Sequence, residues 1–154
     1  MRTASALLVG AVLGIVVLAG SAALITPAKN PPPELDCDDE TKPDSCMVSV
    51  DVVWCGLSDP LRYCVSVLSD PVVIHNRNSS DRKPIDVYWT IINKKYKFAS
   101  NGIVITNGGD ELGGCKSKDD VTFFCKNKHK IFGVYKYTIN VTDANPLDPW
   151  VIND

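Results

Sequence analysis

The sequence has no excess of charge of either sign, and this balance excludes whole classes of function. It contains 16 Lys and Arg residues against 18 Asp and Glu residues, for a formal net charge of −2. A nucleic-acid-binding domain carries a clear basic surplus, so we expect no nucleic-acid partner. Charged residues make up 22% and hydrophobic residues 45% of the chain. That composition is typical of a globular protein and not of a disordered, collagenous or polytopic membrane protein.

The sequence also lacks the residue patterns of common enzyme and metal sites. It has no Gly-x-Ser-x-Gly motif, and its acidic residues fall in loops. It has no Cys-x-x-Cys pair for zinc. A blue-copper site is disfavoured because neither His75 nor His129 has a Cys at the short spacing of such a site, and Met47 is the only internal Met. We therefore expect no catalytic residue, no cofactor and no metal, and a protein that is not an enzyme.

An uncharged apolar segment covers residues 4–25 and follows the positive charge of Arg2. Basic residues on the short N-terminal side keep that end in the cytoplasm, so the remainder should be exported. A membrane-spanning helix needs about 20 apolar residues. A secretory signal has a shorter apolar centre and a small-residue cleavage site, for which residues 21–23 or 26–28 could serve. The length slightly favours a single-pass inner-membrane anchor with a periplasmic domain over a cleaved, secreted or periplasmic product.

All the cysteines follow the apolar segment: Cys37, Cys46, Cys55, Cys64, Cys115 and Cys125. An even number of cysteines in a small exported domain predicts three disulfides. Six cysteines allow 15 pairings, but successive pairs are separated by only nine, nine and ten residues. The turn-rich residues 56–60 would bring Cys55 and Cys64 together at the mouth of a hairpin. We expect three local bridges, Cys37–Cys46, Cys55–Cys64 and Cys115–Cys125.

Residues 26–45 are rich in proline and in acidic residues. The prolines favour extended polyproline conformations and exclude a sheet interior. The acidic residues could indicate a calcium loop, but an EF-hand needs glycine at its sixth position, where this segment has Thr41. We expect a solvated acidic tether over residues 26–45, between the segment at 1–25 and a folded domain at 46–154.

From residue 46 onward the apolar residues repeat every two positions. Alternating runs occupy residues 47–54, 63–68, 85–92 and 134–141, and shorter β-branched or aromatic runs occupy 72–75, 102–106, 121–125 and 150–152. Turn residues separate the runs, and no helical stripe occurs in this part of the sequence. The pattern predicts an all-β, antiparallel sandwich. Its expected core residues are Val50, Val87, Trp89, Ile91, Ile105, Phe123, Tyr135 and Tyr137.

The run at 134–141 resembles a strand of immunoglobulin-like domains. Gly133, Tyr135 and Tyr137 form a Gly-x-Tyr-x-Tyr pattern, which is where those domains place a tyrosine whose hydroxyl bonds to nearby backbone. Trp89 would be the core tryptophan of the facing sheet. Tyr137 stands where the second cysteine of the immunoglobulin bridge would be. The resemblance implies an immunoglobulin-like sandwich without the inter-sheet bridge that is typical of that fold.

A looser resemblance concerns the order of four segments, at residues 87–91, 96–103, 135–141 and 147–154. In this order they are similar to a group of uncharacterised exported proteobacterial proteins, over about residues 46–154. That family brings no known activity. The resemblance therefore implies an exported compartment and the sandwich fold, and nothing about a ligand.

A basic region gathers Lys116, Lys118, Lys126, Lys128, Lys130 and Lys136, offset in part by Asp119 and Asp120. It could meet an anionic surface such as lipid head groups or an envelope polymer. Lysines also protect sheet edges, and we expect no aromatic residues interleaved with these. We expect His75 to be solvated at a strand end and His129 to lie on a charged hairpin rim.

Together these features predict an exported, membrane-tethered, non-catalytic domain of the cell envelope that acts by binding or spacing. It would use loops at one end of the sandwich or an exposed sheet edge. The inner membrane would be one partner, and another envelope protein or an anionic surface a second. A purely structural assembly subunit remains an alternative, as does a periplasmic hydrolytic enzyme or small-molecule-binding protein.

Overall fold

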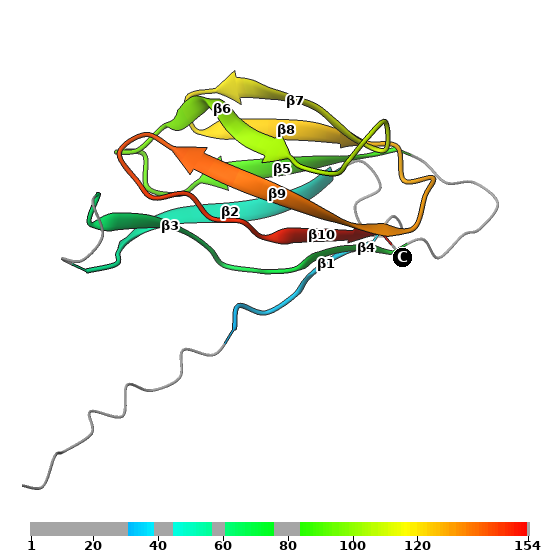
Figure 1. Ribbon diagram of the computed structural model, residues 1–154, viewed down its shortest axis with the longest axis horizontal. Helices are drawn as coiled ribbons and strands as arrows, with labels where there is room; N and C mark the ends of the chain where they lie inside the picture. The colour runs from blue at the N-terminus through cyan, green and yellow to red at the C-terminus, as the bar shows by residue number, and fades with distance from the viewer. Residues whose placement is uncertain (1–30, 39–44, 57–60, 76–83, 154) are drawn as a thin grey trace, which may run out of the picture.

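The computed structural model describes residues 31–38, 45–56, 61–75 and 84–153 of the chain. These residues form ten strands in two five-stranded sheets that pack as a sandwich (Figure 1). The expected N-terminal anchor or signal lies outside the described residues, as does most of the acidic segment. No helix among the described residues is long and apolar enough to cross a membrane.

The strand order defines the two sheets. Sheet A has the order β1–β4–β10–β9–β6 and consists of Leu35–Asp38, Val72–His75, Trp150–Asn153, Gly133–Val141 and Phe98–Ile105. Sheet B has the order β3–β2–β5–β8–β7 and consists of Tyr63–Val67, Ser45–Trp54, Ile85–Ile91, Thr122–Asn127 and Leu112–Asp119. Eight of these ten strands fall on the runs that the sequence predicts.

The period-two pattern is confirmed by burial. Along β5 every second residue is buried, from Ile85 to Ile91, and the residues between them are partly exposed. All eight expected core residues are buried except Ile105, which is partly buried against the core. Trp89 from sheet B and Tyr137 from sheet A are both fully buried, with ring centroids 5.2 Å apart. Apolar packing between the two inner faces therefore holds the sandwich together.

The prediction of purely antiparallel sheets is wrong, because both sheets are mixed. Strand β4 is parallel to β1 and to β10, and β2 is parallel to β5. After β3 the chain leaves sheet B to form β4 in sheet A, and then returns as β5. A strand that returns from the other sheet can enter in either direction. Alternation of apolar residues encodes the buried face of a strand and not its direction, so the pattern could not show this.

Two strands were not predicted. Strand β1 falls within the range expected as tether, and it pairs with β4 while Leu35 and Cys37 face the core. Strand β7 is an edge strand whose register with β8 shifts twice. Its sequence carries Gly113 and Gly114 and then exposed charged residues, so it has little apolar alternation. Both are edge strands, where composition is constrained least.

All three predicted disulfides are present. Cys55–Cys64 spans the β2–β3 hairpin and Cys115–Cys125 joins β7 to β8. Cys37–Cys46 connects β1 of sheet A with β2 of sheet B, so a disulfide joins the two sheets at a place other than that of the immunoglobulin bridge. Three disulfides in a domain of this size indicate an oxidising, extracytoplasmic compartment.

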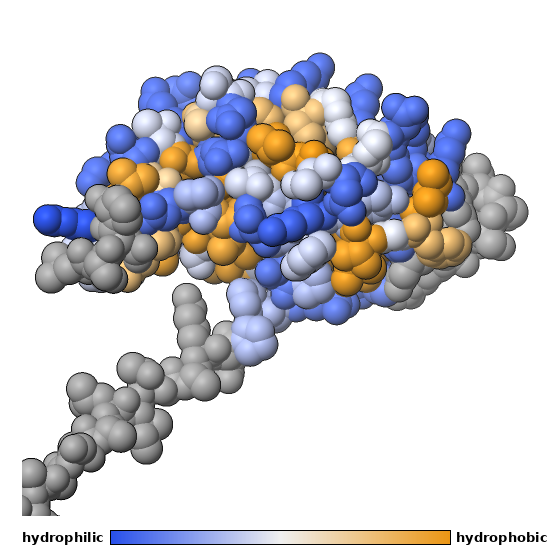
Figure 2. Space-filling view, in the orientation of Figure 1, coloured by the Kyte–Doolittle hydropathy of each residue, from blue (hydrophilic) through white to orange (hydrophobic). Residues whose placement is uncertain are grey.

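The tyrosine expected to bond back to the main chain is Tyr135. Its hydroxyl donates a hydrogen bond to the carbonyl oxygen of Ile131, at 3.2 Å. The outer surface is mixed in character: Figure 2 shows apolar side chains in separate patches among hydrophilic ones on the face in view. Exposed aromatic residues are therefore informative where several of them gather at one place.

Candidate binding site at one end of the sandwich

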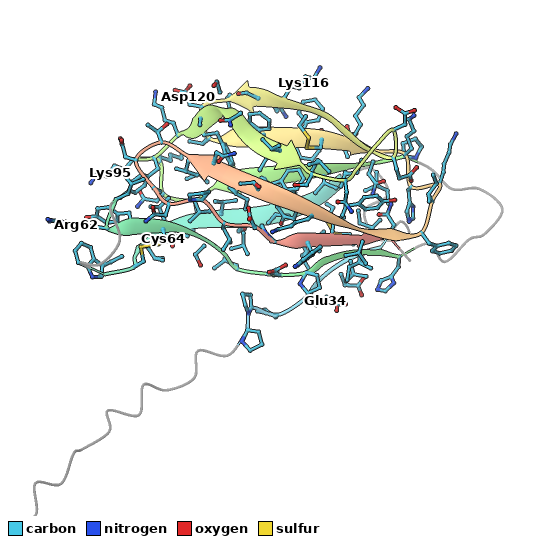
Figure 3. The ribbon with its side chains drawn as sticks, in the orientation of Figure 1. Glu34, Arg62, Cys64, Lys95, Lys116 and Asp120 are labelled. Atoms are coloured by element: carbon cyan, nitrogen blue, oxygen red, sulfur yellow. A yellow bond between two sulfur atoms is a disulfide. The ribbon has the colours of Figure 1, made fainter. Side chains whose placement is uncertain are left out.

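Three aromatic rings lie in a row at the end of the sandwich that carries the β2–β3 hairpin. The ring centroids of Trp54 and Tyr63 are 5.7 Å apart, and those of Tyr63 and Tyr96 are 6.1 Å apart. Trp54 is 55% exposed and Tyr63 37% exposed, whereas Trp89 and Tyr137 are buried in the core. We call this the hairpin end, and Figure 3 shows Arg62, Cys64 and Lys95 gathered there.

The hairpin holds two of the three rings in a fixed frame. Trp54 and Tyr63 are direct cross-strand partners, and each is followed in sequence by a cysteine of the Cys55–Cys64 disulfide. The backbone N–H of Cys55 donates to the carbonyl oxygen of Arg62, at 3.0 Å. A disulfide and a backbone hydrogen bond beside the two rings limit how far they can move apart.

The third ring comes from the turn between β5 and β6. The backbone N–H of Tyr96 donates to the carbonyl oxygen of Asn93, at 3.0 Å, and the N–H of Lys95 donates to the Asn93 side-chain oxygen, at 3.2 Å. An asparagine that bonds to the backbone two residues ahead is typical of a tight turn. The Tyr96 ring packs partly against the core, and the Lys95 ammonium lies 5.7 Å from its centroid.

The loop between β9 and β10 ties the other two loops together. The N–H of Thr142 donates to the carbonyl of Lys97, at 2.9 Å. Asn145 exchanges backbone hydrogen bonds with β3: its N–H donates to Tyr63 and its carbonyl accepts from Val65, at 2.8 and 2.9 Å. Backbone bonds therefore connect this loop both with the chain just before β6 and with β3, and they hold the site in place without a ligand.

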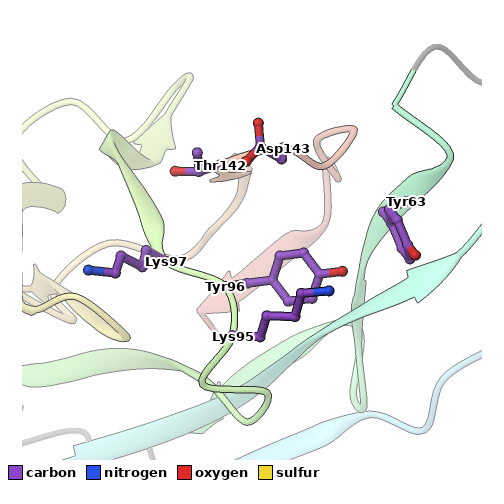
Figure 4. A pocket seen from close by; sticks show the side chains of 6 residues that line it. All are labelled: Tyr63, Lys95, Tyr96, Lys97, Thr142 and Asp143. Atoms are coloured by element: carbon purple, nitrogen blue, oxygen red, sulfur yellow. The ribbon is translucent and has the colours of Figure 1, made fainter.

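A cavity of about 360 Å³ opens between the three loops. We call it the end pocket, and it is lined by Tyr63, Lys95, Tyr96, Lys97, Thr142 and Asp143. Figure 4 shows the Tyr63 ring on β3 and the Tyr96 ring on the turn between β5 and β6, with Lys95 beside Tyr96 and with Thr142 and Asp143 on another side of the pocket. Its volume lies near the lower end of the range for small-molecule sites.

The charges that line the end pocket nearly cancel. The Lys97 ammonium pairs with the Asp120 carboxylate at 2.5 Å, and both side chains are exposed. Among the described residues, no ion pair involves Lys95 or Asp143. One cation and one anion are thus left to meet a ligand. This balance suits a neutral polar molecule better than a strongly charged one.

Two residues at the hairpin end have left-handed backbone conformations. Arg62 has φ 59° and Asp143 has φ 60°, and His129 is the third such non-glycine residue among those described. Left-handed conformations are uncommon for residues with a Cβ, although Asp tolerates them better than most. Such conformations often occur where a loop is shaped for function. Here one of them lies in the pocket wall and the other precedes a wall residue.

The lining residues determine what the end pocket can do chemically. They offer two aromatic rings with their phenolic hydroxyls, the Thr142 hydroxyl, a carboxylate and two ammonium groups, and they include no His, Cys or Ser and no second carboxylate. Ring stacking and hydrogen bonding are therefore the interactions that it provides. Elsewhere in the described chain, no group of three or more His, Cys, Asp or Glu side chains is placed to hold a metal ion.

The structure divides the predicted basic region between the two sheets. Lys136 lies on β9 of sheet A, 3.2 Å from Asp148, and hydrogen bonds from Thr138 and Lys136 hold the pKa of that carboxyl below its usual value. Lys116, Lys118 and Lys126 lie on β7 and β8 of sheet B. The basic region therefore does not form one surface.

The expectation that no aromatic residues accompany these lysines is wrong. The rings of Tyr88 and Phe124 are stacked with centroids 5.4 Å apart on the outer face of sheet B. The Lys116 ammonium lies 5.2 Å from the Phe124 ring, and the Lys118 ammonium 5.7 Å from the Tyr88 ring. Residues distant in the sequence become neighbours because β5, β8 and β7 are adjacent.

The two histidines lie outside the end pocket. His75 is partly exposed at the end of β4, with its Nε2 atom 3.4 Å from the Asp36 carboxylate. His129 is buried, so its expected place on a charged rim is wrong. Its backbone N–H donates to the Asn127 side-chain oxygen, at 2.9 Å. That bond turns the chain inward after β8.

Sequence reasoning did not identify Trp54, Tyr63 and Tyr96 as site residues. A signal for the first two was present, because an aromatic residue directly precedes each cysteine of the predicted Cys55–Cys64 hairpin. No such sequence signal marked Tyr96, because it comes close to Trp54 and Tyr63 only through the tertiary packing of β5 and β6. Of the six predicted disulfide cysteines, only Cys55 and Cys64 adjoin the site.

Neither a protein-family model nor a curated protein matches this chain.

Proposed function

We propose that this protein is an exported, non-catalytic binding domain of the cell envelope, tethered to the inner membrane, and that it holds its ligand in the end pocket. The observation that carries the proposal is the construction of the end pocket. Three loops are joined by backbone hydrogen bonds and braced by a disulfide, and they present Tyr63 and Tyr96 to one cavity. Loops at one end of a rigid sandwich are a common place for recognition.

Sequence features support the compartment and the tether. The apolar residues 4–25 precede a proline-rich stretch, and the resemblance to exported proteobacterial proteins with immunoglobulin-like domains favours a bacterial periplasm. The disulfides require an oxidising compartment. Residues 26–34, which precede β1, would reach about 28 Å if they were fully polyproline-like. That reach would hold the domain near the membrane.

The tether is tested by fractionation of cells that express the full chain. We expect the uncleaved chain in the inner-membrane fraction, and deletion of residues 27–30 should leave its unfolding midpoint unchanged because no described strand is touched. A cleaved product in the soluble periplasmic fraction would contradict tethering. Such a product would not contradict ligand binding by the end pocket, which a separate experiment tests.

Ligand binding is tested by photocrosslinking in intact cells. A photoreactive residue replaces Lys95 in the end pocket, and in a matched control it replaces Ser117, which is exposed on the edge strand β7 and does not line the end pocket. We expect a discrete crosslinked species from position 95 and none from position 117. Equal crosslinking from the two positions, or none from position 95, would contradict binding at the end pocket.

A further inference from the structure

The aromatic rings at the hairpin end are tilted relative to one another, so they do not form a flat surface. The planes of Trp54 and Tyr63 meet at 82°, and those of Tyr63 and Tyr96 at 54°. A flat ligand such as a nucleobase prefers parallel rings, and none of these pairs is parallel. A puckered ring with C–H groups on its faces can contact tilted aromatic faces, because its slightly positive hydrogens meet their negative π-clouds.

The polar groups around the end pocket call for a ligand that both donates and accepts hydrogen bonds. The Asp143 carboxylate accepts only, the Lys95 ammonium donates only, and the Thr142 hydroxyl does both. All three side chains are exposed at the pocket. Hydroxyl groups arranged around a ring satisfy all three, and two neighbouring hydroxyls can donate to one carboxylate.

A proline-rich peptide is the main rival, because aromatic-lined grooves also bind polyproline helices. Proline has no backbone N–H, so such a peptide offers acceptors and few donors. It would leave the Asp143 carboxylate without a donor. A polyanion is disfavoured for another reason: Lys97 is paired with Asp120, and the remaining Lys95 is balanced by Asp143.

From these features we infer that the end pocket binds a neutral oligosaccharide, with one sugar ring against the exposed faces of Tyr63 and Tyr96 and a neighbouring ring against Trp54. The inference rests on the proposed function, since it names the ligand class of the same site. Trp54 lies outside the pocket lining, beside Tyr63. The row of three rings thus extends beyond the cavity, which favours a short chain of sugars over a single one.

The test measures binding by the full chain in detergent micelles. The probes are tetramers of β-1,4-linked glucose and of β-1,4-linked N-acetylglucosamine, with a decaproline peptide as the rival, and titration calorimetry is the readout. We expect at least one tetramer to bind. Tyr63→Ala or Tyr96→Ala should weaken that binding by about tenfold or more, since aromatic anchors dominate such sites. Asp143→Asn, which keeps the shape and removes the charge, should weaken it several-fold.

Tyr88→Ala is the matched control. It removes a partly exposed tyrosine that stacks on Phe124 on the outer face of sheet B, away from the end pocket. It should leave the affinity unchanged, and unfolding midpoints verify that every variant is folded. Failure of both tetramers to bind would overturn the inference, as would equal weakening by Tyr88→Ala. Binding of decaproline with the same dependence on Tyr63 and Tyr96 would overturn it too, while the proposed binding function would stand.

Discussion

The two ends of the sandwich differ in which side chains they expose to water and which they bury. The hairpin end leaves the aromatic rings of Trp54 and Tyr63 in contact with water. At the other end, which we call the polar end, the polar side chains of Glu111, Asn127 and Asn153 are buried. Each arrangement runs against the usual distribution of residues, and each is informative for that reason.

The polar end satisfies its buried groups internally. The Glu111 carboxylate accepts hydrogen bonds from the backbone N–H groups of Lys130 and Ile131. The Asn127 and Asn153 side chains exchange two hydrogen bonds, at 2.8 and 3.2 Å, and so connect the end of β8 with the end of β10. Buried polar groups with partners fix one arrangement of loops, because any other arrangement leaves them unpaired.

The difference supports the proposal that the hairpin end is the one that meets a ligand. Polar groups at the polar end have their partners within the chain, so they contribute to stability. At the hairpin end the backbone is satisfied, while aromatic faces and polar side chains remain accessible. Substitutions should therefore lower stability at the polar end and lower ligand binding at the hairpin end, and the predictions below test that division.

The largest effect on stability is expected from a substitution in the core, which lies between the two ends. Trp89→Ala removes a fully buried ring that packs against Tyr137. It should lower the free energy of unfolding by about 3–5 kcal/mol, the usual range for deletion of a large aromatic side chain. Urea unfolding followed by circular dichroism measures the change. A near-neutral result would mean that the two sheets do not pack around this residue.

Removal of the Cys55–Cys64 bridge should affect stability and binding together. The double substitution Cys55→Ser and Cys64→Ser opens a loop of nine residues, and the chain-entropy model gives a loss of somewhat under ~3 kcal/mol. The matched control, Cys115→Ser with Cys125→Ser, opens a ten-residue loop and should cost a similar amount. Only the first variant should lose crosslinking from position 95. Equal loss from both would mean that the bridge does not position the rings.

Glu111→Ala should destabilise the polar end without changing the end pocket. It leaves the backbone N–H groups of Lys130 and Ile131 without their acceptor, at an expected loss of about 2 kcal/mol. Glu34→Ala, at an exposed glutamate, should change stability by less than about 0.5 kcal/mol. Chemical denaturation compares the two variants. If Glu111→Ala weakened ligand binding and left the free energy of unfolding unchanged, it would contradict the assignment of stability to the polar end and of binding to the hairpin end.

The smallest effect at neutral pH is expected from Tyr137→Phe. The Tyr137 hydroxyl is buried and, among the described residues, makes no hydrogen bond of normal geometry. Its removal should therefore change the free energy of unfolding by less than about 1 kcal/mol at pH 7. Burial raises the pKa of Tyr137 above its usual value of 10, with a smaller opposing effect of the Trp89 indole N–H.

The sign of the pH dependence follows from that shift. A group with a higher pKa in the folded state binds its proton more tightly when folded, so its contribution is complete below about pH 10 and is lost above it. Burial also raises the pKa of Tyr135, followed by the effect of the Glu111 charge. Stability should fall above about pH 10, and less steeply in Tyr137→Phe. Identical alkaline slopes in both proteins would show that Tyr137 does not contribute.

Much of the secondary structure could be predicted because burial on one face imposes a period of two. That constraint located eight strands, and it identified Trp89 and Tyr137 as core residues. It failed at β1 and β7, where edge positions need little apolar alternation. For the proposed site, the sequence suggested only loops at one end of the sandwich or an exposed sheet edge. It did not identify any of the three aromatic rings as a site residue.

The sequence by itself determined which residues face inward and which cysteines pair. Both properties depend on short separations along the chain: the alternation of neighbouring residues, and loops of nine or ten residues that close at low entropic cost. Tertiary structure alone decided strand direction, sheet order and the end pocket. Tyr63 on β3, and Tyr96 and Thr142 in two connecting loops, are far apart in the sequence. They meet because β3, β5 and β9 reach the same end of two packed sheets.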